Sequence, residues 1–150
     1  MRIYIASSWR NVHGVQMLTK NLRDAGHVVL SFVEKNFGEA IVTDARFKDY
    51  QTAQGMAFED WCWSLSGELA FKFDIESATK CDLLIYLSPS GNDASAEMGA
   101  AWASGVPIFG LWSKGENLGL MRRMFTSCFS DFEGLLVAVE LLSAGKWGAK

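Results

Sequence analysis

The feature that most constrains the fold is an almost continuous apolar run at residues 82–87, with the sequence DLLIYL. Strands that are apolar at consecutive positions are covered on both faces, which is typical of parallel sheets with helices on either side. A second such run, IFGLW, occupies residues 108–112. Between them lie a turn-rich loop at 88–93, a predicted helix of small residues at 94–104 and a Gly-Val-Pro sequence that should end this helix. This part of the chain predicts a strand–helix–strand unit.

The amino-terminal region predicts a unit of the same kind. Residues 2–6 form a short β-prone run, RIYIA, and residues 27–33 form a second one, HVVLSFV. Between them, apolar residues at spacings of three and four share one face of a predicted helix; they are Val15, Leu18, Leu22 and Ala25. Gly26 is placed to end that helix.

The remaining segments complete the domain. The pattern predicts helices at 66–80, 118–125 and 131–143 and a brief strand near 128–129. Residues 34–66 lack a clean period, and we interpret them as an irregular or helical insertion. Short connections between alternating strands and helices favour right-handed crossovers. We therefore expect residues 1–150 to form one α/β domain, a doubly wound, flavodoxin-like or Rossmann-like parallel sheet of about five strands with helices on both faces.

Composition narrows the class of partner. The chain is 49% hydrophobic and 21% charged, with a net charge of −3, and its longest basic run is Arg122-Arg123, so nothing predicts a nucleic-acid surface. No stretch approaches the length of a membrane span. The three cysteines form no CxxC pair, and the two histidines lie far apart, so we expect neither metal nor cofactor. We expect a soluble, cytoplasmic protein with a small-molecule partner.

Two acidic residues provide the best indication of function. Between Asp82 and Lys114 the only charged residues are Asp93 and Glu97, both at the start of the helix after the most buried strand. In doubly wound sheets, ligands bind at the carboxyl ends of the strands, where helix amino termini offer amide donors. Both acids could instead simply cap the helix. We take Glu97 as the centre of the candidate site.

Polar loop residues surround this position. The hydroxyls of Ser7, Ser8, Ser88 and Ser90, with Gly91 and Asn92, could hold a phosphate or a sugar, although serines also form ordinary turns. Trp9 could stack on a nucleobase, or it could belong to the core. The common α/β signatures GxGxxG, GxSxG, HExxH and the phosphate-binding P-loop are all missing from the sequence.

Several segments together resemble the nucleoside 2-deoxyribosyltransferase-like superfamily. They are IYIASSWRN, GHVVLSF, FKFDIESATKCDLLIYLSPSGNDASAEMGAAWASGVPIFGL and LMRRMF. The likeness covers residues 1–33 and 70–142, matches poorly at 34–69, and is greatest to small bacterial and phage members. The superfamily also includes hydrolases of deoxynucleoside 5′-monophosphates. The Glu-x-Gly-x-Ala block that starts at Glu97, followed by Gly-x-Pro before a buried strand, is the most specific part.

The resemblance implies a reaction and roles for particular residues. Glu97 corresponds to the nucleophile that cleaves or exchanges the N-glycosidic bond of a deoxynucleoside or its monophosphate. Asp74 corresponds to the acid that holds a substrate hydroxyl or transfers a proton, and Ser7 and Ser8 to the substrate-binding first loop. Asp93 departs from the pattern, because many members have Gly or Ser there; it remains a third candidate acid.

Two other functions stay open at this stage. The chain could be a nucleotide-binding or signalling module without catalysis, or an NAD hydrolase similar to those of the TIR type, which place one glutamate on the equivalent helix. Tryptophans at 61, 63 and 102 suggest more apolar surface than one core needs, and relatives complete their sites across subunits. We therefore also expect a homodimer.

Overall fold

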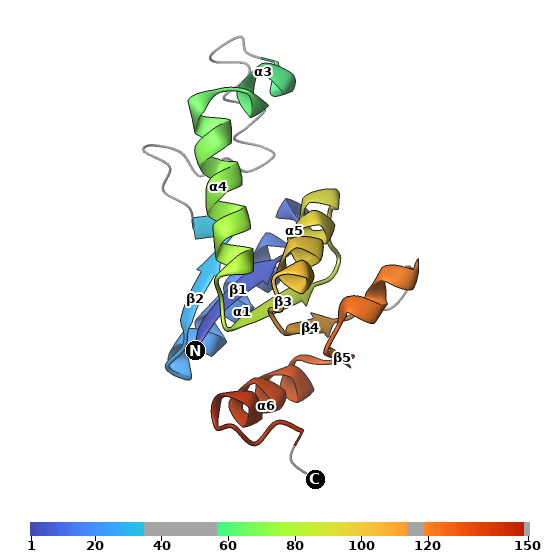
Figure 1. The fold of residues 1–150 in the computed structure, drawn as a ribbon. Helices are drawn as coiled ribbons and strands as arrows, with labels where there is room; N and C mark the ends of the chain where they lie inside the picture. Colours follow the sequence, from blue (N-terminus) through green and yellow to red (C-terminus); the bar gives the residue numbers. More distant parts are fainter. Residues whose placement is uncertain (35–56, 114–118, 149–150) are drawn as a thin grey trace.

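A single parallel sheet forms the centre of the protein. The computed structural model describes residues 1–34, 57–113 and 119–148. Its five strands are β1 (Arg2–Ala6), β2 (Val28–Ser31), β3 (Leu83–Leu87), β4 (Ile108–Leu111) and β5 (Ser127–Phe129). They lie in the order β2-β1-β3-β4-β5, and every neighbouring pair is parallel (Figure 1). The predicted flavodoxin-like sheet is confirmed.

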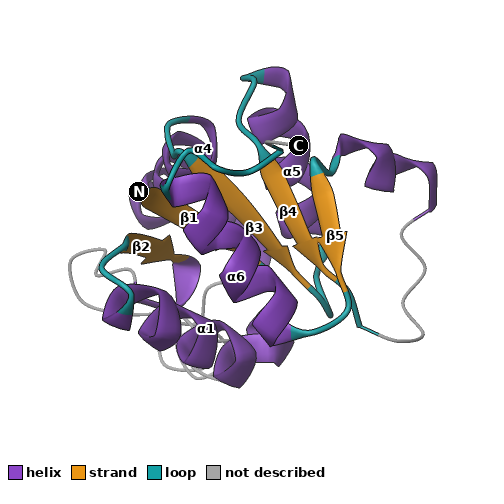
Figure 2. Ribbon diagram, turned by 90° about the horizontal axis from the view of Figure 1, so that it is seen from below, coloured by secondary structure: helices purple, strands orange, loops and turns teal. Residues whose placement is uncertain are grey.

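Helices cover both faces of this sheet. The helices α1 (Val12–Asp24) and α6 (Phe132–Ser143) pack on one face, whereas α4 (Leu65–Thr79) and α5 (Asn92–Ala103) pack on the other (Figure 2). Shorter helical pieces are η1 (Trp9–Asn11), η2 (Phe32–Glu34), α3 (Phe58–Cys62) and η3 (Gly119–Met124). Within the described ranges, none of the helices combines the length and the apolar character needed to traverse a lipid bilayer.

The element boundaries follow local chemistry. Gly26, with φ of 85°, follows α1 in the left-handed region that favours glycine, and the next amide, of His27, bonds back to the Leu22 carbonyl. The second strand is shorter than predicted, because residues 32–34 turn into η2. Within the predicted insertion, residues 58–62 are helical, and residues 35–56 lie outside the described residues.

The register of the strands determines which side chains reach each face. Tyr4 pairs with Leu84 and Ile5 with Ile85, so successive residues of β1 and β3 alternate between the two helix layers. All five residues of β3 are buried, as its apolar run predicts. Tyr4, Leu84 and Tyr86 pack with α4 and α5, and Ile5 and Ile85 with α1 and α6.

Candidate active site

Glu97 lies in the second turn of α5 and points into the protein. Its neighbours on the buried side of the helix are Ala94, Met98 and Ala101, and only 6% of Glu97 is exposed. A carboxylate is rarely this buried without a specific electrostatic environment. The helix begins at Asn92, directly after the loop that leaves β3, so Glu97 is held near the carboxyl edge of the sheet.

Tyr4 joins Glu97 to a second carboxylate. The phenol of Tyr4 donates a hydrogen bond to Oδ1 of Asp74 over 3.0 Å. Tyr4 is fully buried in the middle of β1, and Asp74 is half-buried on α4. Burial, followed by the charges of Glu97 and Asp74, raises the pKa of Tyr4 well above its usual value of 10.0. The phenol therefore stays neutral and donates a proton to hydrogen bonds at any ordinary pH.

The structure thus brings together two of the three predicted acids. Asp74 and Glu97 come from different helices and both act on Tyr4. Asp93 behaves differently: it is exposed in the first turn of α5, and burial, followed by the charge of Asp93, raises the pKa of the Cys62 thiol on α3. Asp93 is one of the contributors to the Cys62 shift and is not among those acting on Tyr4.

Hydrogen bonds from Ser7 and Asn11 join the segment that follows β1 to the end of β3 and the loop after it. The Ser7 hydroxyl donates to the Leu87 carbonyl over 2.6 Å, and Asn11 Nδ2 donates to the Ser88 carbonyl over 3.0 Å. Ser8 caps η1 by accepting a hydrogen bond from the Arg10 amide. The two loops approach so closely that a Cβ added at Gly91 would lie 3.9 Å from Cβ of Ser8.

Tyr86, on β3, anchors the loop that follows this strand. Its hydroxyl bonds to Ser90 Oγ and, over 3.4 Å, to Ser95 Oγ in the first turn of α5. Ser88 is buried, and its Oγ has no hydrogen-bond partner within the described part of the chain. Asn92, the first residue of α5, is exposed. The Tyr86 hydroxyl therefore ties the middle of this loop and the first turn of α5 to the sheet.

Trp9 has a different environment from the other predicted binding residues. Its ring meets Phe32 edge-on, with centroids 4.8 Å apart, and packs against the core on the α1 and α6 face. It remains half-exposed. The part of its surface that packs against Phe32 stabilises the loop after β1.

Two cavities lie farther along the carboxyl edge. The smaller, of about 130 Å³, includes Asn11 and Ser88 in its lining, and the larger, of about 300 Å³, lies beside β5. Glu97 and Asp74 line neither of them. The buried carboxylates and these two cavities are thus distinct features of the protein.

Tyr4, Tyr86 and Asn11 were not among the site residues predicted from the sequence. Each has a hydrogen-bonding group at the carboxyl half of the sheet or in the loops beside it. A signal was present for the tyrosines, because a tyrosine within a strand covered on both faces must find a partner for its hydroxyl. Asn11 gave no comparable signal.

The comparisons with known proteins concern the fold. No protein-family model matches the sequence, and no curated protein matches it. A solved structure of a 2-deoxyribosyltransferase from Bacillus psychrosaccharolyticus matches with a TM-score of 0.64 and 21% identity, over 90% of each chain. The CMP N-glycosidase of Clostridium botulinum matches with a TM-score of 0.57 and 17% identity, over 94% of this chain and 100% of the other.

A third solved structure, of a conserved protein from Enterococcus faecalis V583, has a TM-score of 0.61 and 14% identity, and covers 95% of this chain and 98% of that one. At such identities the matches establish a shared fold. They agree with the resemblance to the nucleoside 2-deoxyribosyltransferase-like superfamily that the sequence motifs indicate.

Proposed function

We propose that this protein cleaves or exchanges the N-glycosidic bond of a deoxynucleoside or deoxynucleoside 5′-monophosphate, with Glu97 as the nucleophile. The observation that carries the proposal is the buried Glu97 carboxylate, which shares the Tyr4 phenol with Asp74 near the carboxyl edge of the sheet. The reaction class is supported by two fold neighbours, one described as a 2-deoxyribosyltransferase and one as a CMP N-glycosidase.

The proposed reaction has two steps. Breaking the bond between base and sugar builds positive charge on the sugar, and a carboxylate beneath the anomeric carbon stabilises that charge or captures it. A Glu97 oxygen forms an ester with the anomeric carbon while the base leaves with its bonding electrons and takes up a proton. Water then breaks the ester in hydrolysis, or the nitrogen of a second base does so in transfer, and each releases its proton.

Tyr4 and Asp74 have supporting roles in this scheme. The neutral phenol of Tyr4 donates to Asp74 and so fixes the orientation of that carboxylate. Asp74 would then hold a sugar hydroxyl or protonate the departing base. Asp93, exposed in the first turn of α5, is the alternative proton donor. The loops that carry Ser8, Ser90 and Gly91 would surround the sugar.

Product analysis on a substrate panel tests the proposal. The purified protein is incubated with deoxynucleosides, their 5′-monophosphates and NAD, and free base is measured by chromatography. Base released from deoxynucleosides or their monophosphates supports the proposal, and nicotinamide released from NAD alone supports the TIR-like alternative. If no base appears while nucleotides raise the melting temperature, the protein is a binding module.

We also propose that the protein is a homodimer. Large apolar side chains are exposed on α4 and α5 and at the α3–α4 junction; they include Trp63, Leu65, Phe71 and Trp102. Exposed apolar groups that gather on neighbouring elements are typical of protein interfaces. Light scattering at tens of micromolar protein should give twice the chain mass, and a monomer mass would contradict the proposal.

A further inference from the structure

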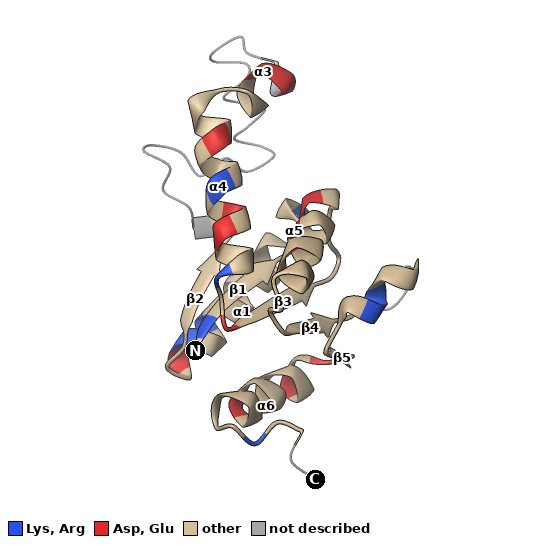
Figure 3. Cartoon of the chain, in the orientation of Figure 1, with Lys and Arg blue, Asp and Glu red and all other residues tan. Residues whose placement is uncertain are grey.

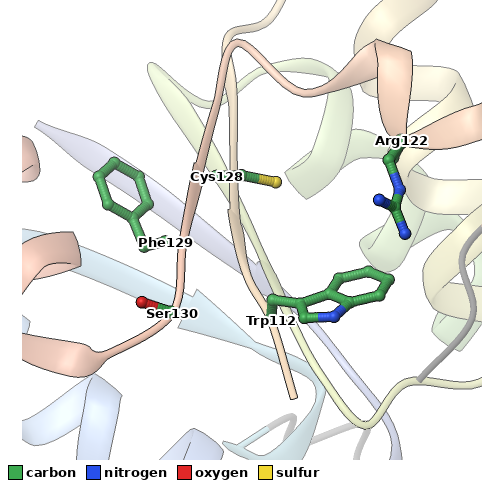
Figure 4. Close-up of a pocket in the computed structure, with 5 residues that line it drawn as sticks. All are labelled: Trp112, Arg122, Cys128, Phe129 and Ser130. Carbon is green, nitrogen blue, oxygen red and sulfur yellow. The ribbon is translucent and has the colours of Figure 1, made fainter. Parts of the chain in front are cut away.

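The larger of the two cavities lies beside β5 and η3. It measures about 300 Å³ and is lined by Trp112, Arg122, Cys128, Phe129 and Ser130 (Figure 4). The Trp112 ring, the Arg122 guanidinium and the Cys128 sulfur face one space, whereas the Phe129 ring points the other way. Cavities that hold small molecules in proteins have volumes of roughly 300–1,000 Å³. This cavity is therefore large enough for a small organic ligand.

The Arg122 guanidinium is held in place by the indole ring of Trp112. The guanidinium carbon lies 4.8 Å from the centroid of that ring, a cation–π arrangement. Trp112 is itself fixed, because its amide donates to the Phe129 carbonyl over 2.9 Å and so continues the ladder between β4 and β5. The N–H donors of a guanidinium lie in its plane, so a guanidinium stacked on a ring keeps them for other partners.

The end of η3 is anchored to β4, which also positions Arg122. The Thr126 amide donates to the Ile108 carbonyl over 2.8 Å, and the Thr126 hydroxyl accepts from the Ile108 amide over 3.0 Å. Phe125 lies over Gly110, where an added Cβ would be 2.7 Å from the Phe125 ring, so a larger residue there would displace the ring. The Phe125 amide in turn donates to the Arg122 carbonyl over 3.0 Å. Arg122 therefore belongs to an anchored turn, and its side chain is preorganised for binding.

The cavity lies in a basic part of an acidic protein. The chain has a net charge of −3, yet within the described residues 106–113 and 119–130 the only charged side chains are Arg122 and Arg123, both on η3 (Figure 3). Of these two, only Arg122 lines the cavity. Among the residues that the structure describes, no carboxylate forms a salt bridge with Arg122. The charge of Arg122 therefore favours an anion in this cavity.

We propose that this cavity binds a small organic anion, with its carboxylate or phosphate group paired to Arg122 and its apolar part against Trp112 and Cys128. A guanidinium forms paired, charge-assisted hydrogen bonds with either group. Glu97 and Asp74 do not line the cavity, so this ligand is additional to the substrate proposed at Glu97. The inference goes beyond the proposed function and does not depend on it.

Protection of the Cys128 thiol measures binding directly. Burial raises the pKa of this thiol and the Arg122 charge lowers it, so an anion bound at Arg122 should both cover the thiol and make it less reactive. Cys62, the other exposed cysteine, is first replaced by serine, and Cys81 is buried. The rate of alkylation by iodoacetamide is then measured against increasing concentrations of each probe at constant ionic strength.

Four probes separate charge from apolar contact. They are benzoate, phenyl phosphate, inorganic phosphate and the neutral benzamide. We expect benzoate or phenyl phosphate to slow alkylation about tenfold at a concentration ten times its Kd, and the tighter of the two identifies the preferred anionic group. Benzamide lacks the charge and inorganic phosphate lacks the apolar part, so both should bind about tenfold or more weakly.

Two neighbouring arginines provide the matched variants. Arg122→Gln removes the charge in the cavity, whereas Arg123→Gln removes an exposed charge that does not line it. Arg122→Gln should raise the Kd of the tighter anion by about tenfold to a hundredfold, the usual effect of losing hydrogen bonds to a charged group, and Arg123→Gln should change it less than about twofold. Arg122→Lys should give an intermediate Kd, because lysine keeps the charge and loses the paired geometry.

Several results would overturn the assignment. They are equal protection by benzamide and benzoate, binding of inorganic phosphate as tight as that of phenyl phosphate, an equal loss in the two glutamine variants, and no protection by either organic anion. Protection should persist in Glu97→Gln, because Glu97 does not line the cavity. A loss of protection in that variant would place the anion at the candidate active site instead, and would also refute a second site.

Discussion

The two faces of the central sheet differ in what they bury. Toward α1 and α6, the strands β1, β3 and β4 present only hydrocarbon side chains; these are Ile3, Ile5, Leu83, Ile85, Leu87, Phe109 and Leu111. Toward α4 and α5, the same strands present Tyr4 and Tyr86, beside the carboxyl groups of Asp74 and Glu97. Both faces are buried to a similar extent, so burial alone does not distinguish them.

The difference separates stability from chemistry. Apolar side chains gain free energy from burial, whereas a buried carboxylate loses hydration and recovers it only through specific partners. A hydrocarbon face is therefore the expected solution wherever folding alone matters. The polar face is destabilising relative to that solution, and such departures are expected at functional sites. Substitutions on the polar face should therefore lower activity more than stability, and substitutions on the hydrocarbon face should lower stability more than activity.

The largest effect is expected for Glu97→Gln, which keeps the shape of the side chain and removes its charge. If the covalent route operates, base release should fall more than about 1,000-fold, because the nucleophile is lost. The melting temperature should stay the same or rise, since a buried charge is replaced by a neutral amide.

The control for this substitution is Glu133→Gln, which changes an exposed glutamate in the first turn of α6. It should retain full activity. If Glu97→Gln turned over substrate at the wild-type rate, Glu97 would have no part in the mechanism and the polar face would need another explanation.

On the hydrocarbon face the expected effect is on folding. Ile85 lies at the centre of β3 and is fully buried, so Ile85→Ala should leave a cavity and lower the free energy of unfolding by about 2–5 kcal/mol. Urea unfolding measures this loss. Turnover per folded molecule should change far less than in Glu97→Gln. A loss of activity without a loss of stability would show that the two faces are not separated in this way.

The sequence predicted the hydrocarbon face better than the polar one. The runs at 82–87 and 108–112 and the 3.6-residue period of α1 are local patterns, and the strands and helices that they predict are confirmed. Glu97 was identifiable because it interrupts an uncharged segment. The Tyr4–Asp74 hydrogen bond joins residues 70 positions apart, on β1 and α4, and no local pattern encodes such a contact.

The loops show the same limit. Ser7 was predicted as a substrate-binding residue from its position after a strand, yet its hydroxyl donates to the Leu87 carbonyl of the neighbouring strand. A serine that follows a strand can bind a ligand or an adjacent backbone group, and only the pairing of β1 with β3 decides between them. The partner of each polar side chain is therefore a property of the sheet order.

The smallest expected effect concerns Tyr4 and the dependence of stability on pH. Because the pKa of Tyr4 is raised in the folded state, the folded protein keeps this proton above pH 10, where the unfolded chain loses it. The stability that Tyr4 contributes is thus fully present below about pH 10 and declines as the pH rises further, by at most about 1.4 kcal/mol per pH unit.

Tyr4→Phe removes both the phenol and this decline. At pH 8 the variant should be less stable by about 1 kcal/mol, because Asp74 loses its hydrogen bond. Between pH 10 and 11 the difference from wild type should shrink or change sign in urea unfolding curves, while every other titrating group is common to both proteins. A difference that stays constant from pH 8 to 11 would mean that Tyr4 titrates as it does in the unfolded chain, and that the polar face does not suppress its ionisation.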